Sequence, residues 1–269
     1  MPLMQFKKPI KSYSQKMTNQ TNITLIGYGK MGQIIHKLIQ LKFPQISDTY
    51  IIDKNDEINQ ATTAKSDLFI DFSHPSAFVS NLEKLFTVKP SAKIVVGTTG
   101  WYQDLEKVQN LIAQNPESAL IYSGNFSIGV NLFWKVIAKA AEEFNNYSDL
   151  YDVFGHELHH NQKADSPSGT AKQTAEILLK NSPTKTQIKY DLAAEKINPT
   201  DLHFSSTRGG HIIGVHSAYF DSEADTIEIT HTARNREGFA LGGIKAALWI
   251  KNKTGFFTID DFINSYKND

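Results

Sequence analysis

The sequence predicts an α/β protein in which a doubly wound parallel sheet is followed by a smaller α+β domain. Two observations lead to this prediction. Apolar runs of strand length alternate with segments of helical period up to about residue 122, which is typical of a parallel sheet with helices on both faces. Beyond about residue 128, a long helical segment gives way to runs in which apolar and polar residues alternate, as they do in strands with one covered face.

The first part of the chain is expected to form a sheet whose strands all end at one ligand-binding edge. Each apolar run is short and is followed by polar or glycine-containing residues. Ligands of such sheets bind in the crevice outside the carboxyl ends of the strands. We expect strands at 23–26, 49–52, 68–72, 93–96 and 119–122, and helices at 31–41, 77–86 and 104–114.

The second part is expected to be a substrate-binding and oligomerisation domain of mixed structure. We expect helices at 129–144, 170–179 and 238–251, and strands at 151–154, 187–192, 202–205, 212–219 and 226–232. The predicted division assigns 19–127 and 237–269 to the first domain and 128–236 to the second. Residues 1–18 contain four lysines, no acidic residue and no apolar stretch of a secretory signal, so we expect a disordered tail there.

Composition excludes several kinds of chemistry. The 269 residues include no cysteine, which rules out disulfides, iron–sulfur clusters, thiolate zinc sites and a cysteine nucleophile. The 28 Lys and Arg residues balance the 28 Asp and Glu residues, so no nucleic-acid or anionic-membrane partner is indicated. No apolar run approaches the ~20 residues that span a bilayer. We expect a cytoplasmic protein that binds small ligands and no metal.

A glycine loop directly follows the first apolar strand. Residues Gly27 to Gly32 read Gly-Tyr-Gly-Lys-Met-Gly, and a helix begins within them, which is the context in which Gly-x-Gly-x-x-Gly binds dinucleotides. The first glycine permits a tight turn, the second lets the backbone approach the pyrophosphate, and the third allows close helix–strand packing. The loop therefore predicts a Rossmann-like domain and, with it, a nicotinamide-dependent oxidoreductase.

An acidic residue and a basic residue end the second predicted strand. Asp53 lies 26 residues after Gly27, where a carboxylate can accept hydrogen bonds from the adenosine ribose and disfavour a 2′-phosphate. The adjacent Lys54 has the opposite preference. The pair leaves NADH and NADPH both open, and a plain surface turn is the alternative interpretation.

The most unusual segment is Glu157 to Ala171, which contains two adjacent histidines, a lysine and a Ser-Gly-Thr helix start. Ser168 is a plausible helix cap, and the free N–H groups of Gly169 and Thr170 then form a carboxylate site. Lys163 and a histidine would supply charge and protons. A solvated loop without function is the alternative.

The same segment contains a rival motif. Residues His156 to His160 fit His-Glu-x-x-His, the signature of zinc peptidases. That motif needs a helix to place both histidines on one face. Gly155 and the strand-like residues before it argue against such a helix, as do Asn161 and the turn at 165–167.

Taken together, these motifs resemble the dihydrodipicolinate reductase (4-hydroxy-tetrahydrodipicolinate reductase) family. The resemblance rests chiefly on Glu-x-His-His-x-x-Lys-x-Asp-x-Pro-Ser-Gly-Thr-Ala at 157–171. Further matching stretches are 95–100, 124–131 and 206–210, followed by His216. Two departures concern the cofactor: Lys30 stands where an arginine is common, and Asp53-Lys54 replaces a frequent Glu-Arg pair.

The resemblance implies an activity and a role for each matching residue. The family reduces dihydrodipicolinate to tetrahydrodipicolinate with NADH or NADPH in diaminopimelate and lysine synthesis, and is usually tetrameric. By resemblance, His159 is the acid/base and Lys163 the proton donor, while His160, Gly169 and Thr170 bind the substrate carboxylates. Arg208 and Arg236 are candidates for a further cation.

The resemblance also implies a set of cofactor-binding residues. They are Gly27, Tyr28, Gly29, Lys30, Met31, Gly32, Asp53, Lys54, Gly97, Thr98, Thr99, Ser123, Gly124, Asn125 and Phe126.

Three alternatives stay open at this point. Another NAD(P)-dependent dehydrogenase of amino-acid metabolism would share the first domain but has no reason to carry 157–171. A zinc peptidase would bind stoichiometric zinc. A non-catalytic dinucleotide sensor would bind NAD(P)H without turnover.

Overall fold

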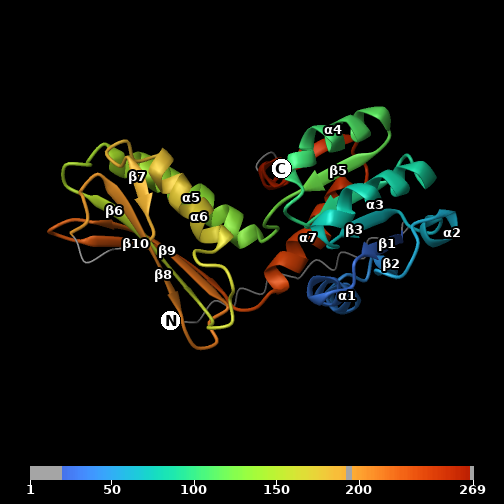
Figure 1. Cartoon of the computed structure of the whole chain (residues 1–269), viewed down its shortest axis with the longest axis horizontal. Helices are drawn as coiled ribbons and strands as arrows, with labels where there is room; N and C mark the ends of the chain where they lie inside the picture. Colours follow the sequence, from blue (N-terminus) through green and yellow to red (C-terminus); the bar gives the residue numbers. More distant parts are fainter. Residues whose placement is uncertain (1–19, 192–195, 267–269) are drawn as a thin grey trace, which may run out of the picture.

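The chain folds around two separate sheets, seen in a computed structural model that describes residues 20–191 and 196–266 (Figure 1). The expected disordered tail at 1–18 lies outside the described residues. No helix in the described ranges is long and apolar enough to cross a membrane.

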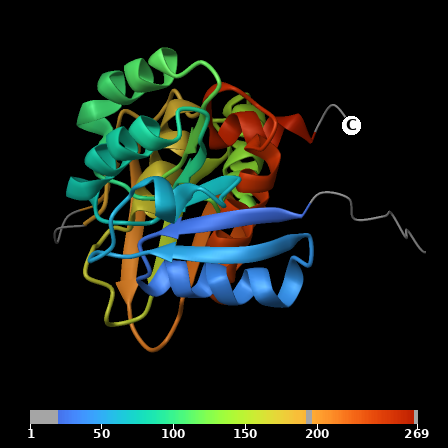
Figure 2. The same cartoon turned by 90° about the vertical axis from the view of Figure 1, so that its right-hand side faces the viewer.

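The first sheet is parallel throughout, with the strand order β11-β5-β4-β3-β1-β2. Figure 2 looks onto this part of the molecule, with β1, β2 and α1 nearest the viewer. Because β1 lies between β2 and β3, the direction of winding reverses at β1, and the ligand crevice lies there. Its strands are β1 (Thr21–Ile26), β2 (Ile46–Ile52), β3 (Leu68–Asp71), β4 (Lys93–Val96), β5 (Ala119–Tyr122) and β11 (Gly255–Thr258).

Helices cover both faces of this sheet, as the alternating pattern predicts. One apolar core packs α1 and α7 against the sheet, and a second core packs α3 and α4 on it. The helices are α1 (Lys30–Lys42), α2 (Gln60–Thr63), α3 (Pro75–Val88), α4 (Leu105–Gln114), α7 (Glu237–Ile250) and α8 (Ile259–Ser265), with a 3₁₀ turn at Tyr102–Asp104. The Rossmann-like fold class is confirmed.

The second sheet is mixed, with the order β10-β9-β6-β8-β7. Helices α5 (Ile128–Asn145) and α6 (Gly169–Lys180) lie over one face of it (Figure 1) and share its apolar core. Its strands are β6 (Asp152–His159), β7 (Gln187–Lys189), β8 (Asp201–Arg208), β9 (Gly214–Asp221) and β10 (Thr226–Ala233). The predicted α+β character is confirmed.

One strand differs from its prediction in a way that matters for the site. The strand predicted to end at Phe154 continues to His159 as β6, because it pairs with β9 on one side and β8 on the other. In an extended strand alternate side chains share a face, so Glu157 and His159 point the same way.

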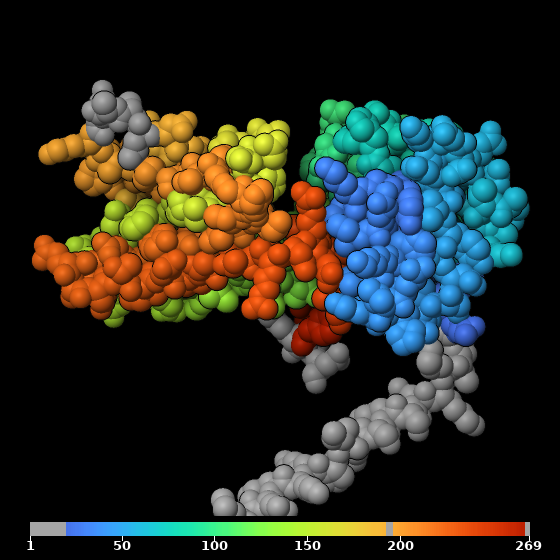
Figure 3. All heavy atoms as spheres, turned by 90° about the horizontal axis from the view of Figure 1, so that it is seen from below, coloured from blue at the N-terminus to red at the C-terminus, as the bar shows by residue number. Residues whose placement is uncertain are grey.

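The chain passes between the two sheets after β5 and after β10, and Figure 3 shows two lobes joined by a narrow waist. These crossings support our proposed division of the chain near residues 128 and 236. Helix α7 packs beside the waist, and a Cβ atom on Gly242 would lie only 1.7 Å from the carbonyl oxygen of Phe126.

We predict that Gly242→Ala destabilises the protein by about 2 kcal/mol or more, because a backbone carbonyl cannot move aside as a side chain can. Gly243→Ala is the matched control. Its Cβ would first meet the Phe72 ring at 3.8 Å, and loss of a helical glycine then favours folding by up to about 1 kcal/mol. Urea unfolding measures both, and equal effects of the two variants would contradict the close packing of α7.

Candidate active site

A cavity of about 1160 Å³ lies between the two lobes and is lined from both. The first lobe contributes part of the predicted nicotinamide side, and the second contributes the predicted acid/base and carboxylate-binding residues. The lining residues that the sequence predicted are Thr99, Ser123, Gly124, Asn125, His159, His160, Lys163, Gly169, Thr170 and Arg236. Residues far apart in the sequence thus face one space.

The glycine loop lies at the point where the sheet reverses its winding and does not line this cavity. Gly27 has a φ of 89°, and a Cβ there would lie 2.8 Å from the Phe72 carbonyl oxygen. A Cβ on Gly32 would lie 2.4 Å from the Gly27 carbonyl oxygen. A Cβ on Gly29, in contrast, would project into open space, and this residue caps α1 without a side-chain acceptor. The free N–H groups of α1 and the open space fit a pyrophosphate.

Asp53 lies beside the glycine loop. Its Oδ1 atom accepts a hydrogen bond from the backbone N–H of Tyr28 at 3.3 Å, which holds the carboxylate at the loop. Lys54 and Lys30 are exposed. The structure therefore places the Asp53 carboxylate next to the glycine loop, and its role toward an adenosine ribose stays a prediction.

Three residues predicted to bind the cofactor, Gly97, Thr98 and Phe126, lie beneath the surface of the first lobe. A Cβ on Gly97 would lie 2.1 Å from the Phe72 ring, and Phe126 is buried in the core. Thr98 Oγ1 donates to the buried Asp71 at 2.9 Å. These residues shape the strand ends and do not line the cavity.

Asp71, which the sequence analysis did not single out, ties two of these strand ends together. Its Oδ1 atom also accepts hydrogen bonds from the backbone N–H and hydroxyl of Ser73 at 2.8 and 2.7 Å. Burial raises the pKa of this carboxyl, and this effect is larger than the opposite effect of its hydrogen bonds. The carboxyl connects the loop after β3 to the loop after β4.

The N-terminus of α6 opens onto the cavity. Ser168 caps the helix by accepting the N–H of Ala171 at 3.0 Å, as the sequence predicted. A Cβ on Gly169 would meet nothing within 4 Å. Thr170 Oγ1 accepts a hydrogen bond from Asn125 Nδ2 of the other lobe at 3.3 Å. The terminus offers N–H groups and a partial positive charge to an anion in the cavity.

Lys163 lies at the same cavity and is paired. Its ammonium is 2.6 Å from Asp165 Oδ1. Burial would raise the pKa of Asp165, but the Lys163 ammonium outweighs it and lowers this pKa. His160 lies three residues before Lys163 in the same loop, and its backbone N–H donates to the Ile212 carbonyl oxygen at 2.7 Å.

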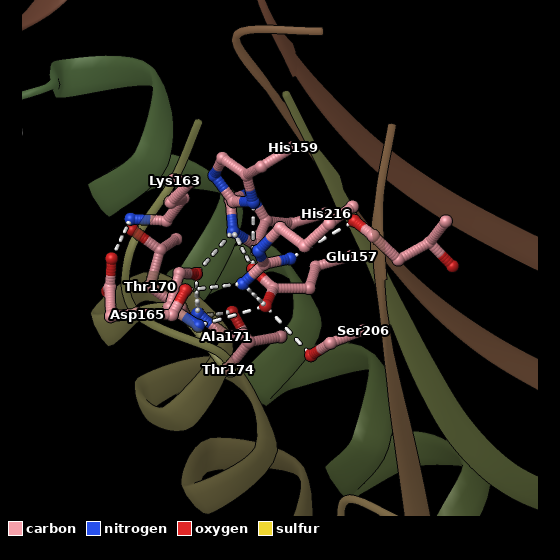
Figure 4. Close-up of polar contacts among 12 residues, drawn as sticks. Glu157, His159, Lys163, Asp165, Thr170, Ala171, Thr174, Ser206 and His216 are labelled. Carbon is pink, nitrogen blue, oxygen red and sulfur yellow. Dashed lines mark hydrogen bonds and ion pairs between the residues drawn. The ribbon is translucent and has the colours of Figure 1, made fainter. Parts of the chain in front are cut away.

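A buried carboxylate lies beneath His159 (Figure 4). Glu157 is fully buried, and its Oε2 atom is 3.0 Å from Nδ1 of His159 and 3.5 Å from Nε2 of His216. Its Oε1 atom accepts hydrogen bonds from the Ser168 N–H, the Ser206 hydroxyl and the Arg208 guanidinium at 2.8–2.9 Å.

These contacts set the charge of the cluster. Burial alone would raise the pKa of Glu157, but the close approach of His159 and His216 and the hydrogen bond from Ser168 outweigh it and hold this pKa far below its usual range. Burial lowers the pKa of His216, although Glu157 opposes that effect. Glu157 is therefore an anion and His216 a neutral imidazole near neutral pH.

The sequence did not predict the contacts of Glu157. It suggested Arg208 as a cation for the substrate, whereas the structure shows it bound to Glu157. Arg208 Nη2 donates to Glu157 Oε1 and to the Asp165 carbonyl oxygen, so it is engaged within the protein, whereas Arg236 lines the cavity. Tyr102 and Tyr122 also line it and were not predicted. Strand alternation between Glu157 and His159 was the available signal, hidden by a strand predicted too short.

The zinc-peptidase alternative has no structural basis. Residues 156–159 lie in β6 and not in a helix, and the side chain of His156 contacts Ser205 at 2.9 Å. Within residues 20–191 and 196–266, Glu157, His159 and His216 form a group whose ligand atoms lie within 4.8 Å of one another, as a metal site would need. The Arg208 guanidinium bound to the same carboxylate disfavours a second cation there.

A dinucleotide cradle in a parallel sheet and an adjoining cavity with acid/base side chains define a two-domain, nicotinamide-dependent oxidoreductase. Comparison with known proteins gives the family. A family model described as "Dihydrodipicolinate reductase, N-terminus" matches residues 21–126, and one described as "Dihydrodipicolinate reductase, C-terminus" matches 129–263. The chain belongs to the dihydrodipicolinate reductase family, as its motifs predicted.

Relatives cover nearly the whole chain. A 4-hydroxy-tetrahydrodipicolinate reductase from Christiangramia forsetii is 38% identical over 92% of this chain and 100% of its own length. One from Buchnera aphidicola subsp. Schizaphis graminum is 35% identical over 90% of this chain and 97% of its own. A dipicolinate-bound dihydrodipicolinate reductase from Paenisporosarcina sp. TG-14 has the same fold, with a TM-score of 0.70 at 22% identity over 90% of this chain and 99% of that one.

Proposed function

We propose that this chain reduces dihydrodipicolinate to tetrahydrodipicolinate, using NADH or NADPH, in the diaminopimelate and lysine pathway. One observation carries the proposal beyond family membership. A single cavity is lined by Thr99 and 123–125 on the cofactor side and by Lys163, His159 and the N-terminus of α6 on the other. A cyclic imine with two carboxylates needs this combination of a hydride donor, a proton donor and anion sites.

The carboxylate-binding role falls to the second lobe. The N-terminus of α6 at Gly169 and Thr170 attracts one carboxylate, and His160 and Lys163 add donors from the preceding loop. Asn125 bonds Thr170 from the opposite lobe, so the anion site adjoins the cofactor side. This arrangement supports holding the ring between the nicotinamide and the acid/base side chains.

The proton is assigned to the same side of the cavity. A reduced nicotinamide held against Thr99 and residues 123–125 would supply a hydride to a carbon of the conjugated ring, which would leave negative charge on the ring-nitrogen side. Lys163 or His159 donates the proton that neutralises this charge. To do so, Lys163 must exchange its 2.6 Å contact with Asp165 for the substrate.

Closure of the two lobes is part of the proposal. The chain crosses the waist near 127–131 and 235–238, and both Gly129 and Gly238 lie next to the Ser127 hydroxyl. Bending at these segments would bring hydride and acceptor together and exclude water, which strengthens the contacts to the carboxylates.

We predict that Lys163→Ala lowers kcat by more than the ~10²–10⁴ typical of one general acid, because it also removes charge stabilisation. The measurement is the loss of NAD(P)H absorbance while the preceding synthase makes the substrate from pyruvate and aspartate semialdehyde. Lys139→Ala, an exposed lysine of α5 that pairs with Glu142 and Glu143, is the matched control. Near-normal turnover of Lys163→Ala would contradict its role.

The same assay separates the remaining alternatives. Another NAD(P)-dependent dehydrogenase of amino-acid metabolism would oxidise the cofactor only with a different substrate. A dinucleotide sensor would bind NAD(P)H and leave its absorbance unchanged. Neither alternative explains why residues 157–171 build the second half of the cavity.

The choice between NADH and NADPH is proposed to depend on Asp53. Its carboxylate is held at the glycine loop by the Tyr28 N–H and would repel a 2′-phosphate, whereas the adjacent Lys54 would attract it. We therefore propose that the protein uses both cofactors. Asp53 favours NADH, and Lys54 favours NADPH.

We predict that Asp53→Ala raises the ratio of kcat/KM for NADPH to that for NADH by about 10-fold, since loss of one charge repulsion near a surface contributes about 1–1.5 kcal/mol. Asp48→Ala, which removes an exposed carboxylate of β2, the strand that ends just before Asp53, serves as the control. An unchanged ratio in Asp53→Ala would contradict the role.

A homotetramer assembled through the second sheet is also proposed, as the resemblance implies. One face of this sheet carries α5 and α6, while the opposite face presents a row that includes His156, Tyr219 and Glu228. Phe154 and Tyr219 stack there with ring centroids 4.8 Å apart. A cytoplasmic location likewise stays a prediction.

We predict a solution mass of four chains by light scattering, and a smaller mass for Phe154→Asp, because a charge in this face must be desolvated on assembly. Leu41→Asp, on the exposed surface of α1, is the control. A monomeric wild type would contradict the assembly.

A further inference from the structure

The two oxygens of the Glu157 carboxylate have different surroundings. Oε1 accepts three hydrogen bonds, from Ser168, Ser206 and Arg208. Oε2 faces two imidazole nitrogens instead, Nδ1 of His159 at 3.0 Å and Nε2 of His216 at 3.5 Å. One oxygen is thus anchored to the protein, and the other is directed at the proposed acid/base.

The 3.0 Å distance restricts the protonation of His159. A neutral imidazole carries a hydrogen on one ring nitrogen and a lone pair on the other. A lone pair on Nδ1 would lie 3.0 Å from an oxygen of an anionic carboxylate. Repulsion in a buried site is strong, so the proton belongs on Nδ1.

We propose that Glu157 is a positioning residue that holds a proton on Nδ1 of His159 and thereby leaves Nε2 as the ring nitrogen that exchanges protons in the cavity. The proposal rests on the proposed function, which makes His159 an acid/base. It adds that a carboxylate two residues away in the same strand determines which atom of that histidine reacts.

Space around Nε2 agrees with this assignment. His159 lines the cavity, and Gly214 on the neighbouring strand approaches the ring. A Cβ on Gly214 would lie 3.0 Å from Nε2 and 3.4 Å from Cδ2. Glycine at this position leaves the ring free to hold both its contact with Glu157 and its place at the cavity.

The same carboxylate is also connected to Lys163 through two intermediate residues, Arg208 and Asp165. Arg208 Nη2 bonds Glu157 Oε1 at 2.9 Å and the Asp165 carbonyl oxygen at 2.7 Å. Asp165 Oδ1 in turn pairs with Lys163. The charges of Glu157, Arg208, Asp165 and Lys163 sum to zero, so the chain of contacts is electrically balanced and connects both proposed proton donors to one anion.

Replacing Glu157 by glutamine places a hydrogen-bond donor next to Nδ1 of His159 where wild type has an acceptor. The three donors at Oε1 require an acceptor, so the amide oxygen takes that position. The amide NH₂ group then takes the place of Oε2 and presents a donor to Nδ1. His159 is expected to respond by moving its proton to Nε2 and accepting the amide N–H at Nδ1. Nε2 can then no longer take up a proton and pass it to the substrate as a cationic imidazolium, which is what the proposed chemistry requires.

The experiment compares wild type, Glu157→Gln and the control Glu142→Gln, an exposed glutamate of α5. ¹⁵N NMR of histidine-labelled protein reports the tautomer, with the His159 signal assigned by its loss in His159→Gln. We expect an Nδ1–H tautomer in wild type and in Glu142→Gln, and an Nε2–H tautomer in Glu157→Gln. Turnover in the coupled assay should fall by on the order of 10²-fold or more in Glu157→Gln, mainly in kcat.

Binding of NADH, followed by its fluorescence, should be unchanged in Glu157→Gln, since the glycine loop belongs to the other lobe. Urea unfolding with the same midpoint as wild type shows that the lobe containing Glu157 is folded as well. If Glu157→Gln does not fold, Gly214→Ala provides the test, because it crowds Nε2 and leaves Glu157 intact. We expect it to lower kcat as well, with the Nδ1–H tautomer retained.

Each outcome bears on the inference. An Nε2–H tautomer in wild type, or wild-type kcat in a folded Glu157→Gln, would overturn it. A wild type that binds NADH but does not consume it in the coupled assay would contradict the proposed function instead, and the NMR result would still report whether Glu157 sets the tautomer.

Discussion

The second lobe contains a fully buried carboxylate, that of Glu157, and its strand ends are arranged around this charge. An isolated buried charge is unfavourable by several kcal/mol, so it must be paired and hydrogen-bonded. Glu157 on β6 meets this demand with Ser206 and Arg208 on β8, His216 on β9 and Ser168 at the start of α6. Loss of one partner of a buried ion pair typically costs about 3–5 kcal/mol. The ends of three strands and a helix are thereby held together beneath the cavity.

The chemistry is divided between the lobes, and the cavity is where the two parts meet. The first lobe provides the cradle at Gly29 and the buried Asp71 that ties its strand ends. The second provides His159 and Lys163, the proposed acid/base pair, and a helix terminus that can attract anions. The contact of Asn125 with Thr170 joins them. A hinge at the waist suits this division, because each lobe keeps its own core while the distance between hydride donor and acceptor changes.

Local sequence patterns predicted most of the fold but only part of the site. Helical periodicity gave α1 and α5, and the glycine loop gave the cradle, because both are determined over a few residues. β6 was predicted too short, since Gly155 and the polar residues after it look like a turn until β8 and β9 pair with them. The short α2, β11 and α8 carried too little pattern to be recognised. The cluster at Glu157 could not be assembled from sequence because, apart from His159, its partners lie 11 to 59 residues away. Asp71 was missed because an aspartate at a strand end is common, and its burial depends on the whole sheet.

The most direct measurement of the central claim is a crystal structure with NADH and pyridine-2,6-dicarboxylate, a planar dicarboxylate that resembles the substrate. We expect the nicotinamide to lie against Thr99 and residues 123–125. We expect the dicarboxylate to bind at Gly169 and Thr170, near His160 and Lys163. The two rings should lie about 3–3.5 Å apart, as hydride transfer requires. A dicarboxylate bound elsewhere, or a nicotinamide directed away from the cavity, would contradict the central claim.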